Sequence, residues 1–161
     1  MKKAAAYVAK ELGKADPSNK KVYAANAKTW GKELDALETW AKREISKIPR
    51  QRRYLVTAHA AFGYFCRDFG FKSIPVAGAS EENASSKYLA EAINQIRKNS
   101  VTTAFPEKNA NPRALDSVIK TVGLRKGTAL IADGSASGVT TYKAFIQHNV
   151  RAIVSGLGGG S

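Results

Sequence analysis

The sequence predicts an α/β fold in three layers, a four-stranded parallel sheet flanked by helices, preceded by a long helix. Apolar residues recur at alternating steps of four and three from Tyr23 to Ile45, a spacing typical of one long helix. After this stripe, short apolar runs alternate with helical patterns. Such an order requires a parallel sheet with right-handed crossovers and helices on its faces.

The first 49 residues are predicted to be helical. Residues 1–15 form an amphipathic helix, and Asp16–Pro17 marks a second helix start, with a side-chain cap and a proline at the first helical position. This long linking helix occupies residues 16–49 and ends near Ile48–Pro49. It is longer than a crossover in a small α/β unit needs, so we expect it to span a larger protein than the sheet alone.

Residues 50–157 are predicted to form the α/β lobe, and the glycine-rich residues 158–161 are interpreted as a leftover flexible linker. Four apolar runs predict the strands: Tyr54–Thr57, Ser73–Ala77, Val101–Phe105 and Thr128–Ala132. Caps and apolar stripes predict the helices between and after them: one through Phe62 to Gly70, one starting at Ser80 with Glu81 and Glu82, one capped by Asn111–Pro112, and Val139–Leu157.

Composition excludes several classes of protein. The 161 residues, 43% of them hydrophobic, suffice for one soluble domain with a core, and no apolar run approaches the roughly 18 residues of a membrane span. The single cysteine, Cys66, excludes an internal disulfide and a cysteine-cluster zinc site. The amino terminus has no cleavable secretory signal, so we expect this chain to stay in the cytoplasm when expressed.

The charge is strongly basic, with 26 Lys and Arg residues against 13 Asp and Glu and a net charge of +13. Such a surplus favours acidic partners, and a basic polyanion- or nucleic-acid-binding α/β module is the alternative function. The basic residues are spread along several helices, however, and the only dense cluster is Arg50, Arg52 and Arg53. Because no aromatic–basic stacking motif accompanies this cluster, we expect no specific nucleic-acid partner.

Three polar residues follow predicted strands. His59 comes after the first strand, Glu107 after the third and Asp133 after the fourth. The carboxyl ends of parallel strands meet at one edge of the sheet, where ligands collect, so these side chains are expected to converge. An imidazole with a carboxylate suits zinc or manganese, and Glu107 is either a ligand or the group that fixes the imidazole tautomer. Helix capping and loop polarity would explain the same residues without a metal.

The same residues allow an enzyme, in which His59 acts as a general base oriented by a carboxylate. We expect no enzyme, because the sequence has no nucleophile elbow, phosphate-binding glycine loop or redox motif. Residues 133–138 lack the lysine and the glycine spacing of a phosphate loop. His148 lies within the last predicted helix and is interpreted as packing or capping.

Five stretches of the chain resemble the metal-type solute-binding proteins of ABC importers, which carry manganese or zinc. The resemblance covers nearly the whole chain up to Leu157, and the His-x-x-Phe-x-Tyr-Phe element beginning at His59 is its most specific part. The stretches are residues 16–26, 55–65, 105–107, 130–134 and 141–149.

The resemblance implies two α/β lobes joined by one long helix, with the metal in the cleft between them. This chain corresponds to the carboxyl-terminal lobe and the linking helix. The four ligands of such proteins are two histidines of the amino-terminal lobe, then one His or Glu and one Asp of the carboxyl-terminal lobe. His59 and Asp133 match the last two, and Glu107 matches a supporting position. Ala60 stands where many relatives have Asp, which leaves the metal preference open.

No segment matches the amino-terminal lobe, so the resemblance implies half a metal site. We expect it to bind Zn²⁺ or Mn²⁺ weakly, not at all, or only on self-association. A homodimer would use the exposed linking helix and the cleft edge, and each copy would give His59 and Asp133 to a shared ion. The parent protein would be periplasmic or extracellular, lipid-anchored or secreted, and would dock on an ABC permease.

Overall fold

A computed structural model describes residues 1–78, 86–133, 136 and 138–158 of the chain. The chain divides into two compact units, Met1–Arg43 and Glu44–Ser161. The first is called here the helical hairpin and the second the α/β unit. None of the described helices is long and apolar enough to cross a bilayer.

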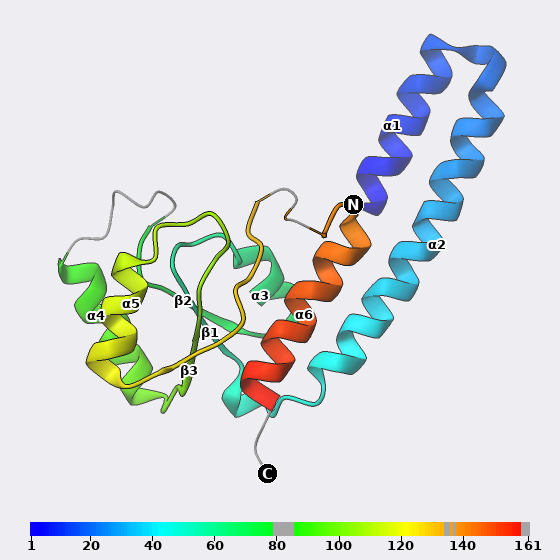
Figure 1. Cartoon of the computed structure of the whole chain (residues 1–161). Helices are drawn as coiled ribbons and strands as arrows, with labels where there is room; N and C mark the ends of the chain where they lie inside the picture. Colours follow the sequence, from blue (N-terminus) through cyan, green and yellow to red (C-terminus); the bar gives the residue numbers. More distant parts are fainter. Residues whose placement is uncertain (79–85, 134–135, 137, 159–161) are drawn as a thin grey trace. The chain divides into compact units, whose positions relative to one another are not determined.

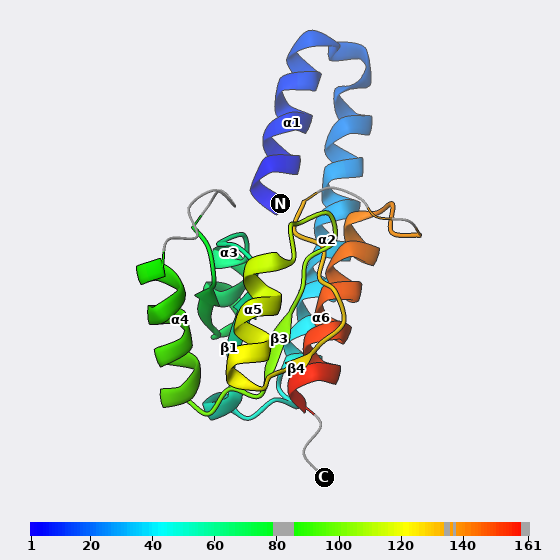
Figure 2. The ribbon, with the colours of Figure 1, turned by 60° about the vertical axis from the view of Figure 1, so that its left-hand side comes forward.

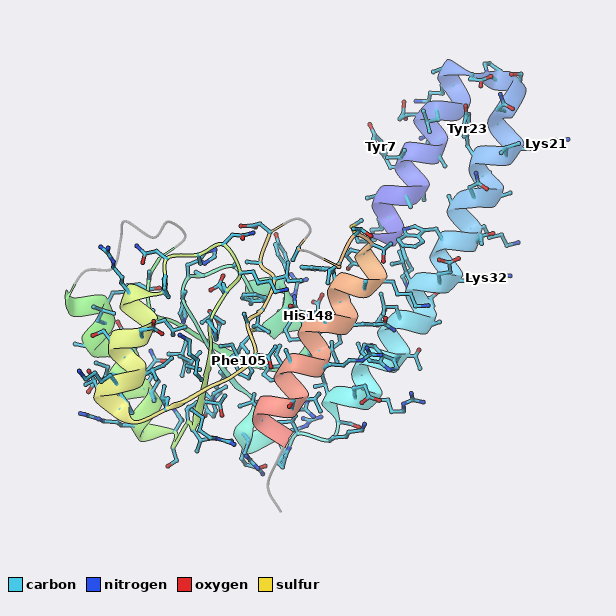
Figure 3. All side chains as sticks on the ribbon, viewed as in Figure 1. Tyr7, Lys21, Tyr23, Lys32, Phe105 and His148 are labelled. Atoms are coloured by element: carbon cyan, nitrogen blue, oxygen red, sulfur yellow. The ribbon has the colours of Figure 1, made fainter. Side chains whose placement is uncertain are left out.

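The helical hairpin is formed by α1 (Lys2–Ala15) and α2 (Lys20–Ile45), whose last two residues belong to the α/β unit. A short 3₁₀ turn, Pro17–Asn19, joins them, and the carboxylate of Asp16 accepts a hydrogen bond from the Asn19 backbone N–H. The predicted cap at Asp16 is therefore confirmed, although a 3₁₀ turn precedes the α-helix. Lys21 and Lys32 project from α2 away from α1 (Figure 3).

The α/β unit contains a four-stranded parallel sheet in the order β2-β1-β3-β4, which confirms the predicted fold class. At its centre, Val56 of β1 pairs with Ile74 of β2 on one side and with Ala104 of β3 on the other. The elements are β1 (Tyr54–Thr57), α3 (Gly63–Phe69), β2 (Lys72–Pro75), α4 (Ser86–Lys98), β3 (Thr103–Phe105), α5 (Arg113–Val122), β4 (Arg125–Lys126) and α6 (Tyr142–Gly158), with a 3₁₀ turn at Arg50–Arg52.

Helices cover both faces of this sheet. Figure 1 shows α4 and α5 on one face and α3 and α6 on the other, and Figure 2 shows the same layers from a second side. On the first face, a core of aliphatic side chains is buried between the sheet, α4 and α5: Val56, Ile74, Val76, Ala92, Ile96, Ala104, Leu115 and Val118. On the second face, Phe105 is completely buried and the Thr103 hydroxyl donates to the Gly156 carbonyl of α6 at 3.0 Å.

The fourth strand differs from its prediction at Thr128–Ala132. Regular pairing with β3 occurs earlier, at Arg125–Lys126, and returns only as a single bridge between Glu107 and Leu130. Between the pair Ala104–Lys126 and this bridge, the chain after β3 has two residues and the chain after β4 has three. The extra residue after β4 makes a bulge in the ladder. Pro106, which has no N–H to pair, lies opposite this bulge.

Other boundaries differ or are not described. Strand β2 is Lys72–Pro75 rather than Ser73–Ala77, and β3 begins at Thr103 rather than Val101. The last helix begins at Tyr142 rather than Val139, because the Thr141 hydroxyl oxygen accepts the Ala144 N–H and caps the first turn. Gly158, predicted to be linker, is the last residue of α6, and residues 159–161 lie outside the described residues. The predicted helix start at Ser80, Glu81 and Glu82 also lies outside them.

Candidate metal centre

The three polar residues predicted from the strand ends all lie in the α/β unit, beyond the carboxyl ends of its strands. His59 is two residues past β1, and Glu107 is two residues past β3. Asp133 follows Leu130, whose bridge to Glu107 extends the sheet at the same edge. The structure brings His59 and Glu107 into direct contact, whereas Asp133 is solvent-exposed.

The Glu107 carboxylate holds His59 at two points. One oxygen, Oε1, accepts the His59 backbone N–H at 2.9 Å, and the other, Oε2, lies 2.7 Å from Nδ1 of the imidazole. The Glu107 side chain is 0% exposed and that of His59 only 16%. The contact between Nδ1 and Oε2 is not aligned as a hydrogen bond, and neither atom has another partner among the described residues. With a carboxylate against Nδ1, the proton belongs on Nδ1 and the Nε2 lone pair is left for a ligand.

The electrostatics of this pair favour a cation nearby. Burial raises the pKa of Glu107, while the hydrogen bond from the His59 backbone N–H and the electrostatic interaction with the His59 ring act in the opposite direction. The negative charge of Asp133 raises the pKa of Glu107 further, so Asp133 is near enough to interact with it. Two carboxylates at one edge, one of them desolvated, are stabilised together when a positive ion lies between them.

The segment that leads to Asp133 is held by α6 through two residues. Nε2 of His148 lies 2.8 Å from the Ala129 carbonyl oxygen, on the side of α6 that faces the sheet (Figure 3). Asn149, which is 3% exposed, pairs with both backbone groups of Ile131. Sequence reasoning missed Asn149, because it lies in the polar run Gln147–His148–Asn149 and nothing in the sequence sets it apart from its neighbours.

The part of the chain that the structure describes contains no group of three His, Cys, Asp or Glu side chains placed to hold one ion. His59, Glu107 and Asp133 therefore do not form such a group in this structure, although all three lie beyond the carboxyl ends of strands. Nitrogen and oxygen donors of this kind suit zinc, manganese and iron.

The comparisons identify the class of protein. The family described as ZnuA, zinc-uptake complex component A, periplasmic, matches residues 1–156. The chain belongs to this family of solute-binding proteins of metal ABC transporters, which confirms the resemblance predicted from the sequence.

Individual relatives bind different metals. The iron-binding protein YfeA of Yersinia pestis is 29% identical over 94% of this chain and 50% of its own length. The manganese-binding lipoprotein MntA of Bacillus subtilis is 27% identical over 91% of this chain and 51% of its own. The periplasmic zinc-binding protein TroA of Treponema pallidum has a similar structure, with a TM-score of 0.85 and 28% identity over 94% of this chain and 58% of that one.

The chain spans about half the length of the curated relatives it matches. The family description names metal uptake and the relatives' names name metal binding, and none of these similarities supports the alternative of a basic polyanion-binding module. The names of these three relatives differ in the metal, which is iron, manganese and zinc in turn.

Proposed function

We propose that this chain is the carboxyl-terminal lobe and linking helix of a divalent-metal solute-binding protein, and that it carries half of the metal site. Zn²⁺ or Mn²⁺ is the cargo. His59 provides Nε2 and Asp133 a carboxylate oxygen as direct ligands, and Glu107 orients the imidazole. The whole protein delivers its ion to an ABC permease outside the cytoplasm.

The observation that carries this proposal is the double contact between Glu107 and His59. A fully buried carboxylate that accepts the backbone N–H of a histidine and lies 2.7 Å from its Nδ1 restrains the ring and favours the proton on Nδ1. This arrangement is common behind metal-binding histidines, because it leaves Nε2 unprotonated and increases its basicity. The nearby charge of Asp133 supplies the second negative group that a divalent cation requires.

Two protein ligands leave a divalent ion incompletely coordinated. Zinc takes four ligands in most protein sites, so water or another polypeptide has to provide the rest. With water alone we expect weak binding. A second copy of this chain, in contact through the linking helix and the edge of the site, would supply another His59 and Asp133 and bind the ion more tightly.

Titration of the chain with Zn²⁺ and Mn²⁺ tests the proposal. Calorimetry is expected to give one weak site, whose affinity falls sharply but stays measurable in His59→Ala and in Asp133→Asn. Glu107→Gln keeps an acceptor for the His59 backbone N–H but presents an amide N–H₂ to Nδ1, which forces the ring into the other tautomer. We expect about a 10- to 100-fold loss of affinity in this variant. Asp68→Asn is the matched control, since Asp68 is an exposed carboxylate paired with Arg67.

Two further measurements sharpen the result. The chain has only two histidines, so the imidazole signals in a proton NMR spectrum are simple to follow, and Zn²⁺ is expected to shift that of His59 and not that of His148. Light scattering during the titration separates the two modes of binding, because a mass that doubles with zinc requires the shared site. Equal zinc binding by the wild type, His59→Ala and Asp133→Asn would contradict the proposal.

A further inference from the structure

The backbone of residues 129–131 connects the edge of the sheet to Asp133. On one side it continues the pairing with the chain that follows β3: the Leu130 N–H donates to the Pro106 carbonyl at 2.8 Å, and the Lys108 N–H donates to the Leu130 carbonyl at 2.8 Å. In a strand, the backbone groups of successive residues point to opposite sides. Ala129 and Ile131 therefore face away from β3, toward the open edge of the sheet.

Two side chains of α6 occupy that open edge in place of a further strand. The Asn149 amide donates from Nδ2 to the Ile131 carbonyl at 2.9 Å, and its Oδ1 accepts the Ile131 N–H at 2.9 Å. His148 adds a contact of 2.8 Å between Nε2 and the Ala129 carbonyl. A primary amide carries the same donor and acceptor as a peptide group, so Asn149 completes the hydrogen bonds of Ile131 as a neighbouring strand would.

Ile131 and Asn149 are both buried, with exposed fractions of 1% and 3%. Water cannot replace this pair of hydrogen bonds without opening the interface between α6 and the sheet, since buried backbone groups are almost always paired. The position of Ile131 is thus fixed from both sides, by Asn149 directly and through Leu130 by the bridge to Glu107. Asp133 is two residues further along the chain.

We propose that Asn149 is a positioning residue for Asp133: by clamping Ile131 to α6, it holds the Asp133 carboxylate at the edge where Glu107 holds His59. The inference rests on the proposed metal function. The positions of His59 and Asp133 would then both depend on the bridge between Glu107 and Leu130. A shift of Ile131 would move Asp133 relative to His59 and weaken the binding of an ion by both residues.

A purely structural role for Asn149 is the competing explanation, and Thr103 offers a matched control for it. Thr103 is 2% exposed and its hydroxyl donates to the Gly156 carbonyl, so it also ties the sheet to α6. It does so at β3 itself, before the chain reaches Glu107. The Thr103 hydroxyl also accepts from Arg125 of β4 at 3.3 Å, upstream of Ala129. Thr103→Val therefore weakens the attachment of α6 without removing a hydrogen bond of residues 129–131.

The test is a thermodynamic cycle of Zn²⁺ affinities measured on the full chain. Asn149→Leu is expected to weaken zinc binding about tenfold, as supporting residues of metal sites commonly do, and Thr103→Val by less than about twofold. If Asn149 acts through Asp133, then adding Asn149→Leu to Asp133→Asn produces no further loss. Equal losses in Asn149→Leu and Thr103→Val, or independent effects of the two substitutions in the cycle, would overturn the clamp.

Amide hydrogen exchange of the wild type serves if Asn149→Leu does not fold. Zn²⁺ is expected to slow exchange of the Ile131 N–H, whose acceptor is Asn149, and this slowing should vanish in Asp133→Asn. Unchanged exchange at Ile131 in a chain that does bind zinc would overturn the proposed role of Asn149 and leave the proposed metal function standing. A wild-type chain that takes up no zinc would overturn the proposed function, and the role of the clamp in metal binding with it.

Discussion

The helical hairpin and the α/β unit bury their apolar residues very differently. The twelve largest fully buried side chains of the described residues all belong to the α/β unit, among them Phe105 and Ile96. The hairpin buries only the smaller set Leu34, Leu37 and Ala41, all in the second half of α2. Five of the seven exposed large apolar side chains of the described residues belong to it: Met1, Tyr7, Val8, Leu12 and Val22. The outer part of the hairpin thus depends more on local helix and turn interactions than the α/β unit does.

This difference predicts which substitutions destabilise each unit. Close packing makes a core intolerant of added atoms, whereas an exposed helix responds to its intrinsic propensity and its caps. The same substitution, glycine to alanine, should therefore have opposite effects at Gly156 of the α/β unit and at Gly31 of the hairpin. Both tryptophans, Trp30 and Trp40, lie in the hairpin, so their fluorescence follows that unit.

The largest effect is expected for Gly156→Ala in α6. A Cβ atom at this position would lie 2.6 Å from Cζ of Phe105 and 2.7 Å from its Cε1. Phe105 is completely buried and cannot move aside without disturbing β3. We expect a loss of about 1–3 kcal/mol in the free energy of unfolding of the α/β unit. Hydrogen exchange of the most protected β1 amides measures this loss.

A second substitution tests whether the ring is the cause. Phe105→Leu removes Cζ and Cε1, the two atoms nearest the added Cβ. Gly156→Ala should therefore cost less in a Phe105→Leu background than in the wild type. Equal costs in both backgrounds would show that Phe105 is not the obstacle.

A smaller effect of opposite sign is expected for Gly31→Ala in α2. No atom lies within 4 Å of a Cβ built at Gly31, so alanine meets no obstacle there. Alanine also loses less backbone entropy than glycine in a helix interior. We expect the hairpin to gain about 0.5–1 kcal/mol, measured by tryptophan fluorescence during urea unfolding. Destabilisation by Gly31→Ala would mean that the hairpin is packed as tightly as the α/β unit.

The sequence predicted the elements whose signal is local. Tyr54–Thr57 was predicted to the residue, because a central strand of a parallel sheet is buried on both faces and forms a continuous apolar run. The fourth strand was misplaced, because the bulge opposite Pro106 depends on pairing between distant segments. An apolar run alone does not say where a ladder is interrupted.

The same limit applies to the candidate site. His59 and Glu107 could be predicted to share an edge, since both follow strands, but the contact of one carboxylate with both the backbone and the ring of His59 could not. The clamp of Asn149 on Ile131 joins residues 18 apart through a side-chain amide. No periodicity or spacing encodes such a pair, so only the structure reveals it.

The smallest effect is a pH dependence confined to the turn of the hairpin. The Asp16 carboxylate accepts hydrogen bonds from the Ser18 hydroxyl, from Asn19 and from the Tyr23 hydroxyl, which together lower its pKa from the ordinary 3.8 to about 2. Because the folded pKa lies below the unfolded one, the stabilisation is present above pH 3.8 and is lost as the pH falls toward 2.

A titration of the side-chain carboxyl carbon of Asp16 by NMR is expected to give a midpoint near pH 2. Asp16→Asn keeps a capping oxygen but removes the charge, so the pH dependence of the turn in this range should disappear. Glu33→Gln, at an exposed position of α2, is the control and should leave it unchanged. A midpoint near 3.8 would mean that the three donors do not bind the carboxylate in solution, and the hairpin would then lack the local cap on which its turn depends.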